Sequence, residues 1–137
     1  MPSIRFSVQG LPPKKDGANS MWRKGVELPR LMALRKAASE AFSGIPPVAA
    51  GDVEIKVILF ADPTAGDLDN FVTGICDGLM PCHPQVPIEE STWVDLPEAA
   101  RPARAVAYVD DRLVSAIDAR RLAPGEDSPR YEVELKW

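Results

Sequence analysis

The sequence predicts an α/β fold of the α+β type, with a single mixed β-sheet and two main helices packed on it. Strand-like runs of alternating apolar residues occur near both ends of the chain and in its middle. Two longer stretches between these runs place apolar residues at helical spacing. The 137 residues, 45% of them hydrophobic, suffice for one core, so a single domain over residues 1–137 is expected.

The N-terminal segment predicts a strand followed by a basic loop. Apolar and polar residues alternate from Ile4 to Gln9, which is typical of a strand with one buried face. A Gly-Leu-Pro-Pro turn at residues 10–13 ends it. Residues 12–27 are rich in Lys and Arg and show no sustained period, so a loop is expected, with room for a short strand near Trp22.

A helix and an interior strand come next. Pro29 is a favoured first helical residue, and apolar residues recur at helical spacing as far as Phe42, before Gly44 and two prolines stop the helix. Residues 53–60 predict an interior strand, because one face is apolar throughout and the other becomes apolar towards the end.

A second helix is predicted over residues 68–79, where apolar residues form a continuous stripe. Gly74 and Gly78 each disfavour this helix by roughly 1 kcal/mol relative to alanine. Either a close approach by a partner subunit or DNA, or fraying at Gly78, would account for them. A different face of the helix carries three polar residues spaced four apart, namely Asp69, Thr73 and Asp77.

Residues 81–104 hold five of the fourteen prolines and show no period. They predict a long loop, a proline-rich insertion anchored by Trp93 and Val94. The two cysteines are too few for a disulfide framework and match no common zinc spacing. Cys76 is expected in the core and Cys82 in the loop.

The C-terminal third predicts further strands. Residues 105–109 are strand-like and run into an Asp-Asp pair, and residues 113–122 either continue that strand or form a helix. Residues 131–137 alternate again after a Pro- and Gly-containing turn. Pairing of this last strand backwards would make residues 113–137 a hairpin.

Positive charge is concentrated at the N-terminal end. Residues 1–36 have a balance of +6 and residues 37–137 one of −10, giving −4 overall. The total disfavours nonspecific binding to nucleic acid, while a basic wall beside an acidic site and a plain solvated surface both fit the asymmetry. No run approaches the length of a membrane span and no secretory signal is evident, so a cytoplasmic protein is expected.

Two acidic motifs contain the main candidate functional residues. Asp67-Leu68-Asp69-Asn70 opens the second helix, and Asp110-Asp111 ends a strand-like run about forty residues later. Two carboxylates about 5 Å apart repel by roughly 3 kcal/mol at an effective dielectric of about 20, so a cluster needs a cation. Oxygen ligands with no histidine nearby favour Mg²⁺ or Mn²⁺ over zinc. Helix capping by Asp69, a purely structural acidic cluster and a small-molecule phosphohydrolase are alternatives.

With the Gly-Leu-Pro-Pro turn, these motifs resemble the RusA family of Holliday junction resolvases, crossover junction endodeoxyribonucleases that are often phage or prophage encoded. The resemblance spans most of the chain and implies a homodimer that cuts four-way DNA junctions in recombination and repair with Mg²⁺ held by aspartates. It implies metal-binding and catalytic roles for Asp67, Asp69 and Asp111, with Asp110 orienting a ligand or binding water and Asp77 structural or in support. Candidate contacts to DNA phosphates are Lys14, Lys15, Arg23, Lys24 and Arg30.

The chain departs from the family in two places. Thr73 stands where family members commonly carry a lysine implicated in catalysis, and Lys14, Lys15 or Arg112 are the candidates to replace its charge. The alternative is a protein that binds junction DNA without cutting it. The second departure is the proline-rich insertion at about 81–104, which is longer than the family's usual link and could contact DNA, extend a dimer interface or be neutral.

Overall fold

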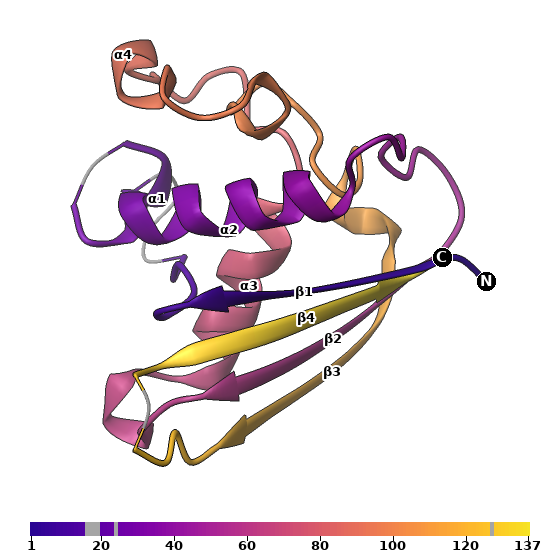
Figure 1. Cartoon of the computed structure of the whole chain (residues 1–137). Coiled ribbons are helices and arrows are strands. Elements are labelled where there is room, and N and C mark those ends of the chain that lie inside the picture. The colour runs from indigo at the N-terminus through magenta and orange to yellow at the C-terminus, as the bar shows by residue number, and fades with distance from the viewer. Residues whose placement is uncertain (16–19, 24, 127) are drawn as a thin grey trace.

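The computed structural model describes residues 1–15, 20–23, 25–126 and 128–137. One mixed sheet contains its strands in the order β1 (Ser3–Gln9), β4 (Arg130–Lys136), β2 (Val53–Phe60) and β3 (Val114–Leu122). Strands β2 and β3 run parallel, whereas the other neighbours are antiparallel. The main helices α2 (Glu27–Ala41) and α3 (Leu68–Gly78) lie on one side of the sheet (Figure 1). The predicted α+β class with one mixed sheet is therefore confirmed.

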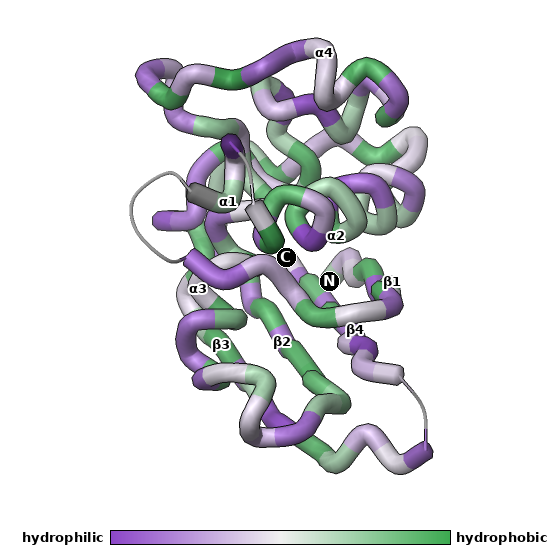
Figure 2. The backbone as a smooth tube through the Cα atoms, turned by 90° about the vertical axis from the view of Figure 1, so that its left-hand side faces the viewer, coloured by the Kyte–Doolittle hydropathy of each residue, from purple (hydrophilic) through white to green (hydrophobic). Residues whose placement is uncertain are grey.

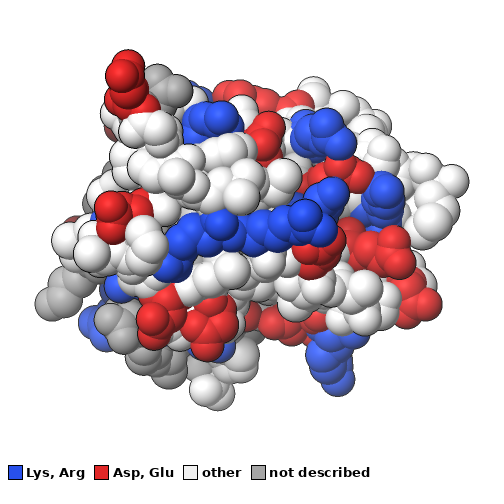
Figure 3. Space-filling view, turned by 90° about the horizontal axis from the view of Figure 1, so that it is seen from below, with Lys and Arg blue, Asp and Glu red and all other residues white. Residues whose placement is uncertain are grey.

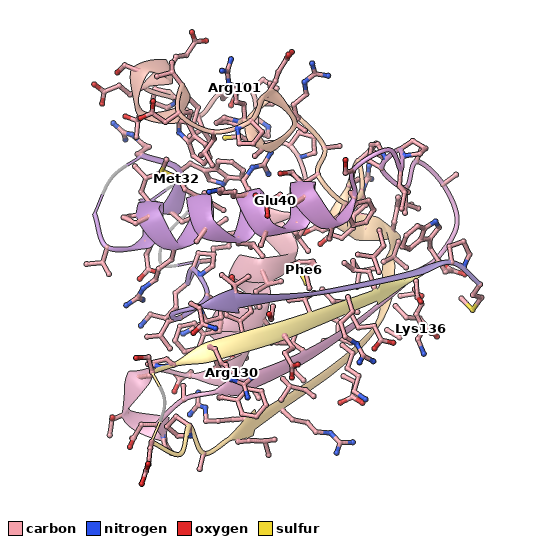
Figure 4. The ribbon with its side chains drawn as sticks, viewed as in Figure 1. Phe6, Met32, Glu40, Arg101, Arg130 and Lys136 are labelled. Atoms are coloured by element: carbon pink, nitrogen blue, oxygen red, sulfur yellow. The ribbon has the colours of Figure 1, made fainter. Side chains whose placement is uncertain are left out.

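The main core lies between the sheet and these two helices. Alternate residues of β2 and β4 are buried, and β2 accordingly alternates between hydrophobic and hydrophilic colours over its first half (Figure 2). Phe6 points into the space between β1 and α2, while Met32 lies on the opposite side of α2, towards the insertion (Figure 4). Burial of each large apolar side chain contributes roughly 1.5–3 kcal/mol, so this layer is the main source of stability.

A second apolar cluster joins the insertion to the outer side of α2. Trp22, in the short helix α1 (Ser20–Arg23), stacks on Trp93, in α4 (Glu90–Trp93), with ring centroids 6.1 Å apart. Trp93 is thus the anchor that was predicted, whereas Val94 is 55% exposed and anchors nothing. The strand expected near Trp22 is wrong: this short segment is helical, and its tryptophan packs on a helix rather than joining the sheet.

One buried arginine holds the insertion in place. The Arg35 guanidinium is fully buried, lies 5.0 Å from the Trp22 ring, and has a pKa lowered by burial to about 10. It uses all three nitrogens to donate hydrogen bonds of 2.6–2.9 Å to backbone carbonyls. The accepting residues are Gly78 and Met80 at the end of α3 and Ala100, Arg101 and Arg104 in the insertion.

The predicted C-terminal hairpin is wrong. Residues 113–122 contain a strand, but β4 lies between β1 and β2, so Leu135 pairs with both Ile4 and Ile55 and never with β3. The strand expected over residues 105–109 is reduced to one bridge between Tyr108 and Val48. Its backbone groups bond to Val48 and to the carbonyl of Leu79 instead of the sheet.

The two ends of the chain meet at one corner of the sheet (Figure 1). The Trp137 amide donates a 3.1 Å hydrogen bond to the Pro2 carbonyl, and the Trp137 ring stacks on Phe42. Both cysteines are free thiols, Cys76 buried in the core and Cys82 partly buried in the insertion, as predicted. Among the described residues, no helix has the length and apolar character needed to cross a bilayer.

Candidate functional site

Two carboxylates from distant parts of the chain meet beside α3. Asp77 lies in the third turn of the helix and is buried, and Asp111 lies in a short 3₁₀ turn directly before β3. Burial, a side-chain hydrogen bond with Asp77 and the Asp77 charge raise the pKa of Asp111 to about 6. The pair therefore concentrates negative charge that a cation would stabilise.

Lys15 supplies one positive charge to this acidic pair. Its ammonium nitrogen lies 2.7 Å from Oδ2 of Asp77. The hydrogen bond and charge of Asp77, with a smaller effect of Asp111, raise the pKa of Lys15. The Lys15 side chain is 42% exposed and the Asp77 side chain 10% exposed, so the ion pair lies at the protein surface rather than in its interior.

Close backbone packing places this lysine. A β-carbon on residue 74 would lie 1.9 Å from the carbonyl oxygen of Pro13, so the loop can rest on α3 only because residue 74 is glycine. The Lys14 amide donates a 2.9 Å hydrogen bond to Glu27, and the Lys14 ammonium lies 5.6 Å from the centre of the Phe71 ring. Residues 13–15 of the basic loop thus lie along the helix that carries Asp77.

The two glycines of α3 are explained within the chain. Gly74 receives the loop backbone, and a β-carbon on Gly78 would come within 3 Å of the Leu31 and Leu34 side chains of α2. The neighbour expected at this face is therefore the protein's own loop and helix, not a partner subunit or DNA. Gly78 is buried and is the last residue of the helix, against which α2 packs.

The other predicted metal ligands lie at the opposite end of α3. Asp67 is the exposed N-cap residue, and its side chain makes no capping hydrogen bond. Asp69 is also exposed and accepts a 3.0 Å hydrogen bond from the Asn70 amide, one of the free helix N–H groups. Asp77 follows Asp69 by eight positions, about 12 Å along the helix axis. Asp111 is thus paired with Asp77, and Asp67 and Asp69 stand apart from that pair.

Asp110 is engaged by its neighbour. It accepts hydrogen bonds from the Arg112 amide at 2.9 Å and from Nε of Arg112 at 3.0 Å. These bonds and the guanidinium charge lower the pKa of Asp110. Asp110 caps the short turn that presents Asp111, while Arg112 adds a second exposed cation near the acidic pair.

The remaining predicted DNA contacts are spread around the basic loop. Arg23 is exposed, and Arg30 pairs with Glu27 at 3.4 Å. Lys24 lies outside the described residues. Tyr108 was not among the predicted site residues, because no motif includes it; its hydroxyl donates a 2.6 Å hydrogen bond to the Cys76 carbonyl. That bond ties the segment leading to Asp111 directly onto α3.

The residues present suit magnesium only in part. Within the described ranges, no three His, Cys, Asp or Glu side chains are grouped as a metal site. Mg²⁺ is nevertheless often bound through one or two carboxylates, with water and substrate phosphate completing its shell. The half-exposed Asp111, with Asp77 behind it, offers such a carboxylate pair.

Two comparisons with known proteins give no match, so the proposed function rests on the residues of the site. No protein-family model matches the chain, and no curated protein matches it either.

Proposed function

We propose that the chain is a RusA-like, metal-dependent endodeoxyribonuclease that resolves four-way DNA junctions, acting as a homodimer in the cytoplasm of a bacterial or phage-infected cell. One observation carries the proposal. Three segments far apart in sequence meet at one place: residues 13–15, the C-terminal part of α3 with Asp77 and the turn carrying Asp111, while Asp67 and Asp69 lie at the other end of α3. An acidic pair beside a basic loop suits a phosphodiester substrate.

The chemistry proposed is hydrolysis of a phosphodiester bond. When bound, Mg²⁺ or Mn²⁺ would supply positive charge to the scissile phosphate and lower the pKa of an attacking water. Asp111 and Asp77 are the carboxylates already paired, and Asp67 and Asp69 are exposed at the N-terminus of α3, where they would offer oxygen ligands to a metal ion. Lys14, Lys15, Arg23, Lys24 and Arg30 would contact DNA phosphates.

Lys15 is the proposed substitute for the lysine that Thr73 replaces. The Thr73 hydroxyl donates a 2.9 Å hydrogen bond back to the Asp69 carbonyl and brings no charge. Lys15 reaches Asp77, which is one helical turn from Thr73, with its ammonium group. The same region of α3 thus receives a positive charge from the loop instead of from the helix.

The test is cleavage of a labelled four-way junction in Mg²⁺, with a linear duplex of the same sequence for comparison. The wild type is expected to cut the junction, and Asp111→Asn to lose at least about a hundredfold in rate. Asp95→Asn, which changes an exposed carboxylate in the insertion, is the matched control and should retain activity. If wild type and Asp111→Asn leave the junction equally intact in Mg²⁺ and Mn²⁺, the nuclease proposal is wrong.

A junction-binding protein without cleavage is the second candidate. It is favoured by the uncharged Thr73 and by the separation of Asp67 and Asp69 from Asp111. Binding that prefers the junction over the duplex, with no nicking and no gain of nicking in Thr73→Lys, would support this candidate over the nuclease.

A further inference from the structure

One edge of the sheet is open for pairing. Strand β3 hydrogen-bonds to β2 on one side and forms the outer edge of the sheet on the other (Figure 1). Six of its nine residues are exposed. The opposite edge, β1, differs because Phe6 and Val8 are buried and α2 packs beside it. Both edge strands have one unpaired side in the described part of the sheet, and β3 is the longer, with nine residues against seven in β1.

This edge carries only part of the usual protection against strand pairing, since Asp118, Arg120 and Arg121 are charged but proline and lysine are absent. Exposed edge strands are commonly shielded by proline, lysine or a covering loop. Residues 114–122 contain neither proline nor lysine. The strand instead exposes two large apolar side chains, Ile117 at 53% and Leu122 at 48%.

The charges of β3 are self-complementary in one antiparallel register. Across a two-fold axis perpendicular to the sheet, a residue can face itself, and its neighbours then pair symmetrically. Centring the axis on Asp118 or Arg120 would place like charges opposite each other, which is unfavourable. Centring it on Ala119 places Asp118 opposite Arg120 of the second copy, twice.

The same register covers the exposed apolar side chains. Ile117 would face Arg121 of the second copy, whose guanidinium donates hydrogen bonds to the Pro63 and Gly66 carbonyls of its own chain, so the contact would be made by its aliphatic stem. Leu122 would face Ala116. In the single chain Asp118 and Arg120 are paired only loosely, at 3.5 Å with both side chains largely exposed, so they are free to exchange partners. On the face seen from below, a band of Lys and Arg crosses the middle and Asp and Glu lie on both sides of it, so both signs of charge are present (Figure 3).

We infer that two copies of this chain associate through their β3 edges, antiparallel and centred on Ala119, to form one continuous sheet. The inference rests on the homodimer of the proposed function and specifies its surface. It assigns Asp118 and Arg120 as the pair that selects the register.

Charge reversal tests the register. Asp118→Arg and Arg120→Asp each replace two attractive pairs by two repulsive ones, and each should weaken dimerisation in analytical ultracentrifugation by at least about tenfold. The double variant Asp118→Arg, Arg120→Asp restores opposite charges and should recover dimerisation. Circular dichroism confirms that each variant is folded. A dimer that ignores all three changes would overturn the β3 interface while leaving a homodimer in place.

A cross-link tests the centre of the interface. In Cys82→Ser protein, Ala119→Cys would place two thiols directly opposite each other, within the usual Cα separation for a disulfide. Mild oxidation is expected to give a covalent dimer linked through residue 119. Ser115→Cys, on the same strand and out of register, should not cross-link. A protein that stays monomeric at high concentration and gives no 119–119 link would overturn the inference, whereas its junction cleavage would be judged separately by the Asp111→Asn comparison.

Discussion

The carbonyl oxygen of Pro13 occupies the space that the first side-chain carbon of any other residue at position 74 would need. This contact between Pro13 and Gly74 fixes the loop along α3 and sets the reach of Lys15 to Asp77. A backbone contact, rather than a side-chain interaction, thus aligns the basic and acidic parts of the candidate site.

Gly74→Ala should therefore be costly although alanine favours helices. The new methyl group would overlap the Pro13 carbonyl, and displacement of backbone of this kind costs about 1–3 kcal/mol. Urea unfolding should show that loss. Thr73→Ala, at the exposed neighbouring position, should change stability by less than about 1 kcal/mol. A Gly74→Ala protein as stable as the wild type would contradict the close approach.

Asp111 should make stability fall as pH rises from about 4 to about 6. Its folded-state pKa is raised to about 6 from an ordinary value of 3.8, so the folded protein binds the proton more tightly than the unfolded chain. The stabilisation is complete below the ordinary pKa and is lost as pH passes through 6. Solvent screening of a half-exposed carboxylate limits it to about 1 kcal/mol. Urea unfolding of the wild type and of Asp111→Asn, repeated at steps of about half a pH unit from about pH 3.5 to about pH 7, measures this contribution to the free energy of unfolding.

The direction of this pH dependence distinguishes a raised pKa of Asp111 from an ordinary one. The difference in unfolding free energy, wild type minus Asp111→Asn, should decrease across that window. A constant difference would mean that neither burial nor Asp77 raises the pKa of Asp111. Added Mg²⁺ should have the opposite trend, raising the melting temperature more as pH increases, because a metal ligand must be deprotonated.

Replacement of Arg35 by methionine should destabilise the protein by at least about 3 kcal/mol. The change leaves buried carbonyl groups without donors, each with a desolvation cost of about 1–3 kcal/mol, although some of them would find water or shift. Lys36→Met, at the exposed adjacent position, is the control. Thermal unfolding followed by tryptophan fluorescence suits this test because Trp22 and Trp93 report on the insertion. An unchanged transition would show that the insertion is held by its apolar cluster alone.

Two buried tyrosines should respond in opposite ways to removal of the hydroxyl. The Tyr131 hydroxyl is buried without a hydrogen-bond partner among the described residues, so Tyr131→Phe should stabilise the protein by about 1 kcal/mol. The Tyr108 hydroxyl donates to the Cys76 carbonyl, so Tyr108→Phe should destabilise by about 1 kcal/mol. Urea unfolding of the two variants in parallel tests the contrast, and the same sign for both would contradict it.

Local pattern predicted most elements but not their pairing. The alternation in β4 correctly indicated a strand, yet its position between β1 and β2 depends on contacts with residues seventy or more positions away. Residues 105–109 have the composition of a buried strand because Val106, Ala107 and Tyr108 are indeed buried. They pack against α3 and residue 48 rather than the sheet, which composition cannot distinguish.

The candidate site was also predicted only in part: individual residues were named, but not which of them lie together. Asp111 could be named from an acidic motif at the end of a strand-like run, and Lys15 was one of several candidates in the basic loop. The partner of both, Asp77, was assigned only a structural or supporting role, since nothing in its spacing from Asp69 reveals that Asp111 lies beside it. Its place four residues after Thr73, on the same helical face, was the available signal.

The hydrogen bond between Trp137 and Pro2 makes the chain nearly a closed ring. A short linker across this junction would let new ends be opened elsewhere, for example in the exposed turn at residues 49–52 between α2 and β2. The sheet would then be assembled from the same four strands in a different covalent order. What specifies this fold is therefore the set of contacts among its segments, and the order of synthesis is incidental to it.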